Sequence, residues 1–263
     1  MNIEELIKEA ELELADKFRE IDELAYKNSK KVLDSFQKYN VSQAHFGSTT
    51  GYGYDDLGRD TLEKMFADIF GCEDALVRSQ FISGSHALTV ALFSYLRPGD
   101  LMLSITGTPY DTLHEVIGIT PNNSSLASFG VKYDQIDLVD NEFDEEKILD
   151  YLQNNTVKLI EIQRSKGYSS RKSLTISKVE KIIEAIRTVD ENVIIMIDNC
   201  YCEFVNELEP VAVGADVMVG SLIKNLGGGI APNGAYIAGR KDLVELAAER
   251  LTLPGEGREV GPS

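Results

Sequence analysis

Apolar residues recur at intervals of three and four positions through the first forty residues, and polar residues fill the positions between them. Leu14, Phe18 and Ile21 illustrate this spacing. The pattern predicts one long or two shorter amphipathic helices between about residues 3 and 37. Such helices pack against the body of the protein or against a second subunit, and they carry no chemistry of their own.

After this segment and a glycine-rich loop, short continuous apolar runs alternate with stretches of helical spacing. The apolar runs predict strands at 75–77, 101–105, 131–136, 157–162, 193–197, 216–219 and 235–238. Predicted helices occupy 60–71, 87–93, a stretch from near 112, 145–153, 177–189 and 241–251. Strands that are apolar throughout must be covered on both faces. The alternation therefore predicts an α/β fold, with a mainly parallel sheet between two layers of helices.

Asp198 and Lys224 carry the clearest chemistry in the chain. Asp198 ends one apolar strand, and Lys224 lies in a turn rich in serine and glycine after the next strand, three residues beyond Ser221. Ligands of parallel sheets bind beyond the carboxyl ends of the strands. Pyridoxal phosphate needs such a pair, because an acid keeps its ring nitrogen protonated and a lysine forms a Schiff base with its aldehyde. The lysine also serves as the base for the substrate's Cα proton, and Ser221 is expected to bind the phosphate.

Other residues near predicted strand ends supply the remaining contacts. Gly84 and Ser85 form a turn that leads directly into a helix, whose free N–H groups are suited to a phosphate. Tyr110 is expected to cover the cofactor ring and to take part in catalysis, and His86 is the second choice for the ring contact. Arg164 follows a further strand and is expected to bind the cofactor. Because these residues all lie near predicted strand ends, they indicate one site.

Several segments of the chain together resemble one family of pyridoxal phosphate enzymes. They are QAHFGSTTGYGYDDLGRDTLE, RSQFISGSHAL, GTPYDTL, IQRSKGYSSRKSLTI, IDNCY, GSLIKNLGGGIAPNGAYIAG and LPGEGREVG. The chain resembles fold-type I enzymes of the Cys/Met metabolism group. More narrowly, it resembles the methionine γ-lyase-related, aluminium resistance family of cystathionine β-lyase-like proteins. The resemblance extends from about Val41 to the end of the chain.

This resemblance implies the three-layer large domain of fold type I and a carbon–sulfur lyase that acts on a sulfur-containing amino acid by β- or γ-elimination. It also implies a homodimer or homotetramer with sites at subunit interfaces. In that group a tyrosine and an arginine, from the loop before the first large helix, reach the phosphate of the neighbouring subunit. Tyr54 and Arg59 match them here. An aldolase or aminotransferase would meet the same requirements and stays an alternative.

We expect three parts along the chain: a helical arm at 1–40, a pyridoxal phosphate-binding large domain at 41–253, and the start of a linker at 254–263. The linker would lead to a C-terminal small domain that is absent from this chain. In fold-type I enzymes that domain usually supplies the arginine that binds the substrate carboxylate. A non-catalytic fragment that binds the cofactor is therefore a further alternative.

Charge and composition argue against several other classes. The net charge of −17, from 43 acidic and 26 basic residues, disfavours binding to nucleic acid or an anionic membrane. No apolar run approaches the ~20 residues that span a bilayer, and the acidic N-terminus lacks the form of a signal peptide. The 3 cysteines and 3 histidines indicate a reduced, cytoplasmic protein without a metal site. No G-x-G-x-x-G follows the first strand, which disfavours a dehydrogenase-like nucleotide-binding domain.

Overall fold

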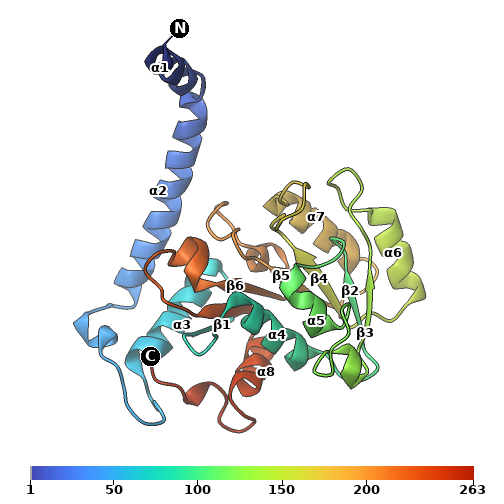
Figure 1. Cartoon of the computed structure of the whole chain (residues 1–263). Helices are drawn as coiled ribbons and strands as arrows, with labels where there is room; N and C mark the ends of the chain where they lie inside the picture. The colour runs from blue at the N-terminus through green and yellow to red at the C-terminus, as the bar shows by residue number, and fades with distance from the viewer. Residues whose placement is uncertain (1) are drawn as a thin grey trace.

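A computed structural model describes residues 2–263 and has a seven-stranded sheet at its centre (Figure 1). The strands are β1 (Asp74–Arg78), β2 (Leu101–Ser104), β3 (Lys132–Gln135), β4 (Leu159–Gln163), β5 (Ile194–Asp198), β6 (Val217–Ser221) and β7 (Ala235–Gly239). Their order across the sheet is β1-β7-β6-β5-β4-β2-β3. β7 is antiparallel to both neighbours, and the other adjacent pairs are parallel. The predicted α/β fold with a mainly parallel sheet is confirmed.

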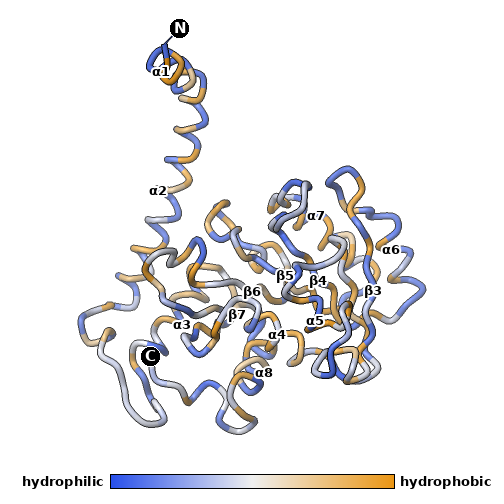
Figure 2. The backbone as a smooth tube through the Cα atoms, viewed as in Figure 1, coloured by the Kyte–Doolittle hydropathy of each residue, from blue (hydrophilic) through white to orange (hydrophobic). Residues whose placement is uncertain are grey.

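Helices cover both faces of the sheet, because alternate residues of a strand point to opposite sides. In β5, Ile195 and Ile197 belong to one buried cluster, and Ile194 and Met196 belong to the other. Figure 2 shows hydrophobic segments running along the strands between the helices. The first cluster is covered by α3 (Leu57–Phe70), α6 (Glu145–Asn154) and α7 (Ile176–Arg187). The second is covered by α4 (Gly84–Tyr95), α5 (His114–Ile117) and α8 (Lys241–Leu251).

The N-terminal segment projects from the body as two helices, α1 (Ile3–Glu13) and α2 (Ala15–Lys38) (Figure 1). These match the two shorter helices of the sequence prediction. The side-chain amide of Asn28 attaches α2 to the body by donating to the carbonyl oxygens of Phe204, at 3.0 Å, and Asn206, at 3.1 Å. Much of the arm's apolar face is uncovered, and Leu12 is 78% exposed. Within residues 2–263 no helix is both long and apolar enough to cross a membrane.

Several helix boundaries differ from the sequence prediction, and α4, expected from residue 87, begins at Gly84. α3 begins three residues earlier than expected, because the carboxylate of Asp56 caps it by accepting the N–H of Arg59 at 2.9 Å. Arg59 therefore lies in the first turn of a helix and not in the preceding loop. The helix expected from residue 112 is reduced to one 3-10 turn, η2 (Asp111–Leu113), and to α5, which ends at Gly118 with a left-handed φ of 101°.

Residues 254–263 run back along the body of the protein. Arg258 Nη1 donates to Asp74 Oδ2 at 2.5 Å, and the carbonyl oxygen of Val260 accepts from Arg78 Nη1 at 2.8 Å. Val260 is 8% exposed. This segment therefore packs against β1 as part of the fold that the structure describes.

The carboxyl ends of four adjacent parallel strands meet at one edge of the sheet. These ends carry Ser104 on β2, Gln163 on β4, Asp198 on β5 and Ser221 on β6. α4 begins at the same edge, since an ideal Cβ on Gly84 would lie 3.1 Å from the Cβ of Ser221. This is the edge at which parallel sheets bind ligands.

The loop before α4 supplies a matched pair of stability variants. Phe81 is fully buried and packs in the core cluster around α4, whereas the next residue, Ile82, is 75% exposed. We expect Phe81→Ala to lower the free energy of unfolding by about 3–5 kcal/mol, because it leaves a cavity. Ile82→Ala should change it by less than about 0.5 kcal/mol. Denaturant unfolding followed by circular dichroism measures both, and equal losses would contradict this packing.

Candidate active site

A pocket opens at the carboxyl edge of the sheet, between the start of α4 and the ends of β4, β5 and β6. The structure brings six of the predicted site residues to its walls: Gly84, Ser85, Tyr110, Asp198, Ser221 and Lys224. They come from separate segments of the chain, and the parallel sheet gathers them because its strand ends share one edge.

Asp198 is the last residue of β5, and only 4% of its surface is exposed. The N–H of Cys200 donates to its Oδ1 at 3.0 Å. Burial raises the pKa of Asp198, while the hydrogen bonding from Cys200 and the charge of Lys224 oppose that rise. A buried carboxylate of this kind is stabilised by a nearby positive charge or donor.

A polar cradle lies between the start of α4 and Ser221. The first N–H groups of a helix have no partner within it and lie at its positive end. Ser85 Oγ and Thr112 Oγ1 are 2.8 Å apart, and Ser221 Oγ is buried without a hydrogen-bond partner among residues 2–263. An ideal Cβ on Gly84 would lie 3.1 Å from Ser221 Cβ and 3.3 Å from Cys200 Sγ. Glycine keeps this space open, and the cradle offers donors to an anion.

Lys224 lies in a short helical turn, η5 (Leu222–Leu226), directly after β6. Its backbone angles, φ −98° and ψ −131°, interrupt that turn. Nζ donates to the hydroxyl of Tyr201 at 2.6 Å and lies 4.2 Å from the centre of the Tyr201 ring. Lys224 and Asp198 line the same pocket, so an amine and a buried carboxyl group face one cavity.

Tyr110 forms an aromatic wall with Tyr168. Their ring centres are 5.6 Å apart and the planes meet at 30°. Interaction with the Tyr168 hydroxyl raises the pKa of Tyr110 to about 12. A second hollow adjoins the first and shares Tyr110, Gln163 and Gly167 with it. A flat wall of this kind suits a planar ligand.

Glu161 lies two residues before Gln163 on β4, on the side of the sheet that carries Asp198. The side chain is fully buried. Its Oε2 accepts from Ser104 Oγ at 2.8 Å, and its Oε1 has no partner among residues 2–263. Burial raises the pKa of Glu161 to about 8, and the nearby charge of Asp198 adds to that rise. Glu161 therefore keeps its proton at neutral pH.

Two predicted residues, His86 and Arg164, do not line the pocket. His86 Nδ1 accepts the N–H of Ile82 at 3.2 Å, and its ring meets Phe81 edge to face. Arg164 is 1% exposed because its guanidinium is enclosed by protein acceptors, among them Asn199 Oδ1 at 2.7 Å. Both side chains are held by local protein groups and neither lines the pocket, so cofactor binding by His86 and Arg164 stays a prediction.

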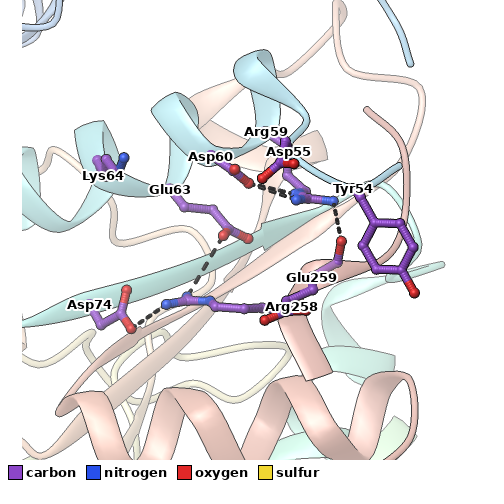
Figure 3. A pocket seen from close by; sticks show the side chains of 9 residues that line it. All are labelled: Tyr54, Asp55, Arg59, Asp60, Glu63, Lys64, Asp74, Arg258 and Glu259. Carbon is purple, nitrogen blue, oxygen red and sulfur yellow. Dashed lines mark hydrogen bonds and ion pairs between the residues drawn. The ribbon is translucent and has the colours of Figure 1, made fainter. Parts of the chain in front are cut away.

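Tyr54 and Arg59 line a separate pocket between the start of α3 and the C-terminal segment (Figure 3). Arg59 is 4% exposed, and its Nη1 donates to the carbonyl oxygen of Gly53 at 2.7 Å. Figure 3 shows its guanidinium joined to Asp60 and Glu259. The contact of Tyr54 and Arg59 with the phosphate of a neighbouring subunit stays a prediction.

Gln163, Tyr201 and Thr112 line the pocket, although the sequence analysis did not select them. Gln163 pairs with Asp198 across β4 and β5. The strand-end argument, applied to every strand, would have found it. Tyr201 and Thr112 lie in turns a few residues after Asp198 and Tyr110, and hydrophobic periodicity carries no information on how such turns fold.

The family model for methionine gamma-lyase matches residues 3–263. The chain belongs to the methionine gamma-lyase family. A relative, the uncharacterized protein YnbB of Bacillus subtilis (strain 168), is 49% identical over 258 residues, covering 97% of this chain and 61% of that protein. A carbon-sulfur lyase involved in aluminum resistance from Clostridium novyi NT, known from a crystal structure, has 45% sequence identity to this chain and a TM-score of 0.94. It covers 98% of this chain, which in turn covers 62% of that one.

This member of the methionine gamma-lyase family thus spans about three fifths of the length of these two relatives. The pyridoxal-5'-phosphate dependent protein YhfS from Escherichia coli shares the fold at 18% identity, with a TM-score of 0.66. The predicted family and fold class are confirmed.

The buried carboxyl group of Glu161 predicts a pH-dependent stability. Its pKa is about 8 in the folded protein against an ordinary value of 4.5. The unfolded chain therefore loses this proton first as the pH rises, and stability falls until the folded protein also ionises. Relative to Glu161→Gln, the wild type should lose on the order of 3 kcal/mol between about pH 5 and about pH 7.5.

Urea unfolding of both proteins at several pH values measures this difference. Glu146→Gln, on the exposed side of α6, is the matched control and should follow the wild type. Parallel pH profiles for the wild type and Glu161→Gln would show that Glu161 is ionised in the folded protein.

Proposed function

We propose that this chain binds pyridoxal phosphate through Lys224 and acts as a carbon–sulfur lyase on a sulfur-containing amino acid, by β- or γ-elimination. The observation that carries the proposal is one pocket in which a buried carboxyl group, a lysine amine and an open anion cradle meet. Membership of the methionine gamma-lyase family supports the same class of reaction.

The pocket fits the cofactor at each of its reactive parts. The unpartnered Ser221 Oγ and the first N–H groups of α4, at Gly84, suit the phosphate. Asp198 suits the ring nitrogen, since a pyridinium charge would stabilise its buried carboxylate. Lys224 would then bond to the aldehyde carbon of the cofactor, and Tyr110 would cover the cofactor ring.

When bound, the cofactor supplies an electron-withdrawing ring that makes the substrate's Cα proton acidic. Nζ of Lys224 would be the base that accepts that proton. Asp198 would hold the ring nitrogen. A tyrosine hydroxyl is protonated at neutral pH, and the pKa of Tyr110, raised to about 12, keeps it so in more alkaline solution as well. That hydroxyl is thus suited to donate a hydrogen bond at the pocket mouth.

We also propose the division into an arm at 1–40, a cofactor-binding domain at 41–253 and a connecting segment from 254. The greater length of the relatives supports a further domain beyond this segment, since the chain covers 61% of one and 62% of the other. We likewise propose that the complete lyase reaction takes place in proteins of this greater length. Aldolase or aminotransferase chemistry, and cofactor binding without turnover, are the competing outcomes.

We infer that the chain forms a homodimer or homotetramer. The exposed apolar side chains of the arm support this, including Leu12 at 78% and Leu33 at 61% exposure, because a second subunit would cover them. In such an assembly Tyr54 and Arg59 would approach the phosphate of the neighbouring subunit.

Cofactor attachment is tested by trapping. Protein mixed with pyridoxal phosphate should develop a visible absorption band, and borohydride should fix the cofactor on Lys224, because reduction makes the carbon–nitrogen bond permanent. Peptide mass spectrometry locates the adduct. Lys224→Ala should lose both signals, whereas Lys241→Ala, at an exposed position of α8, should keep them. An adduct that is missing from Lys224 would overturn the cofactor site.

Turnover is tested with cysteine, cystathionine and methionine as substrates. A lyase should release pyruvate or 2-oxobutyrate, and Asp198→Ala should lose at least about 100-fold in kcat while still trapping cofactor, because the ring nitrogen loses its acid. A coupled dehydrogenase assay measures the keto acid. Adduct formation without any keto acid would leave cofactor binding intact and exclude the lyase reaction for this chain.

A further inference from the structure

Tyr201 makes two contacts with the amine of Lys224 and has no role in the chemistry described so far. Its hydroxyl accepts a hydrogen bond from Nζ at 2.6 Å, and Nζ lies 4.2 Å from its ring centre. Both contacts are strongest with a charged amine, since a hydrogen bond from an ammonium group is charge-assisted and an aromatic face attracts a cation. The tyrosine is therefore arranged around the protonated form of Lys224.

The backbone of Tyr201 lies in the left-handed region, with φ of 67°. Side chains other than glycine, asparagine and aspartate rarely adopt this conformation, and a bulky residue is strained there. Phe204, later in the same turn, has φ of 60°. Two strained aromatic residues in one turn require surrounding structure that holds them in place.

A buried network behind the turn provides that support. Arg164 Nη1 donates to Asn199 Oδ1 at 2.7 Å, and Asn199 Nδ2 donates to Glu209 Oε2 at 2.9 Å. Glu209 Oε1 accepts the N–H of Phe204 at 2.8 Å. Arg164, Asn199 and Glu209 are each no more than 1% exposed. The network fixes both ends of the turn, and with them the side chain of Tyr201 over the pocket.

We propose that Tyr201 is a catalytic residue that holds the ε-amino group of Lys224 in the pocket and stabilises the positive charge on it. The assignment explains why a strained tyrosine stands at this position. It also gives Arg164 a role, as a positioning residue that supports the turn from behind.

The catalytic part rests on the proposed lyase function. In that reaction the Cα–H bond of the substrate breaks, its electron pair stays with the carbon framework, and the proton forms a new bond to Nζ of Lys224. The amine becomes an ammonium ion as this happens. A hydroxyl at 2.6 Å is already in place to stabilise that developing charge. The positive charge of Lys224 also acts on Asp198, at the end of β5, and on Cys200, in the following turn.

The test uses Tyr201→Phe, which keeps the ring and removes the hydroxyl. In cofactor-free protein, only a neutral amine reacts with acetic anhydride. Acetylation of Lys224 should therefore become about 10-fold faster at neutral pH than in the wild type, because the charged amine has lost its acceptor. Peptide mass spectrometry gives the rate, and exposed Lys241 is the internal reference. Tyr26→Phe, an exposed tyrosine on α2, is the matched control and should not change it.

The loaded enzyme gives a second readout. Tyr201→Phe should lower kcat about 10- to 100-fold with little change in KM, because the lost contact stabilises the transition state more than the bound substrate. Wild-type acetylation and wild-type kcat in this variant would overturn the assignment. If wild-type Lys224 fails to trap pyridoxal phosphate, the proposed function fails, and the acetylation rates still decide whether Tyr201 stabilises the charged amine.

Discussion

A buried hydrogen-bond network around Arg164 is the interaction on which the site depends. The guanidinium donates to Asn199 Oδ1 at 2.7 Å and to Asn206 Oδ1 at 2.9 Å, and Glu209 Oε2 lies 3.9 Å from it. Removing one partner would leave a buried charge uncompensated, at a cost of about 3–5 kcal/mol. The network ties the end of β5 to the following turn. This network therefore holds both Asp198, at the strand end, and Tyr201, in the turn.

The electrostatics of the pocket are divided between its two ends. Burial raises the pKa of Asp198, which lines the pocket, and it also raises the pKa of its neighbours Glu161 and Glu203, which do not line the pocket, to about 8 and about 7. This end of the site accumulates acidic groups and gains from a cationic ligand atom beside Asp198. The other end has the unpartnered hydroxyl of Ser221 and the start of α4, which favour an anion. A ligand with a protonated ring nitrogen and a phosphate matches both ends.

The fold and part of the pocket follow from local rules. Continuous apolar runs locate the strands, and their carboxyl ends locate Asp198, Ser221 and Lys224, because parallel strands finish at one edge. The same rule also selects Arg164, whose side chain does not line the pocket. Position along a strand does not report that buried acceptors enclose the guanidinium. The rule does not select Tyr201, for a related reason. Its backbone conformation, with φ of 67°, is fixed by tertiary contacts and not by local preference.

The arm and the site are joined through the same turn. The apolar side chains of α1 and of the first half of α2 are largely uncovered, and the subunit contact proposed above would cover them. The second half of α2 is fastened to the body where Asn28 donates to the carbonyl oxygens of Phe204 and Asn206. Asn206 is also an acceptor for Arg164. A subunit contact formed by the arm would therefore bear on the turn that presents Tyr201 to Lys224, which couples assembly to the geometry of the amine.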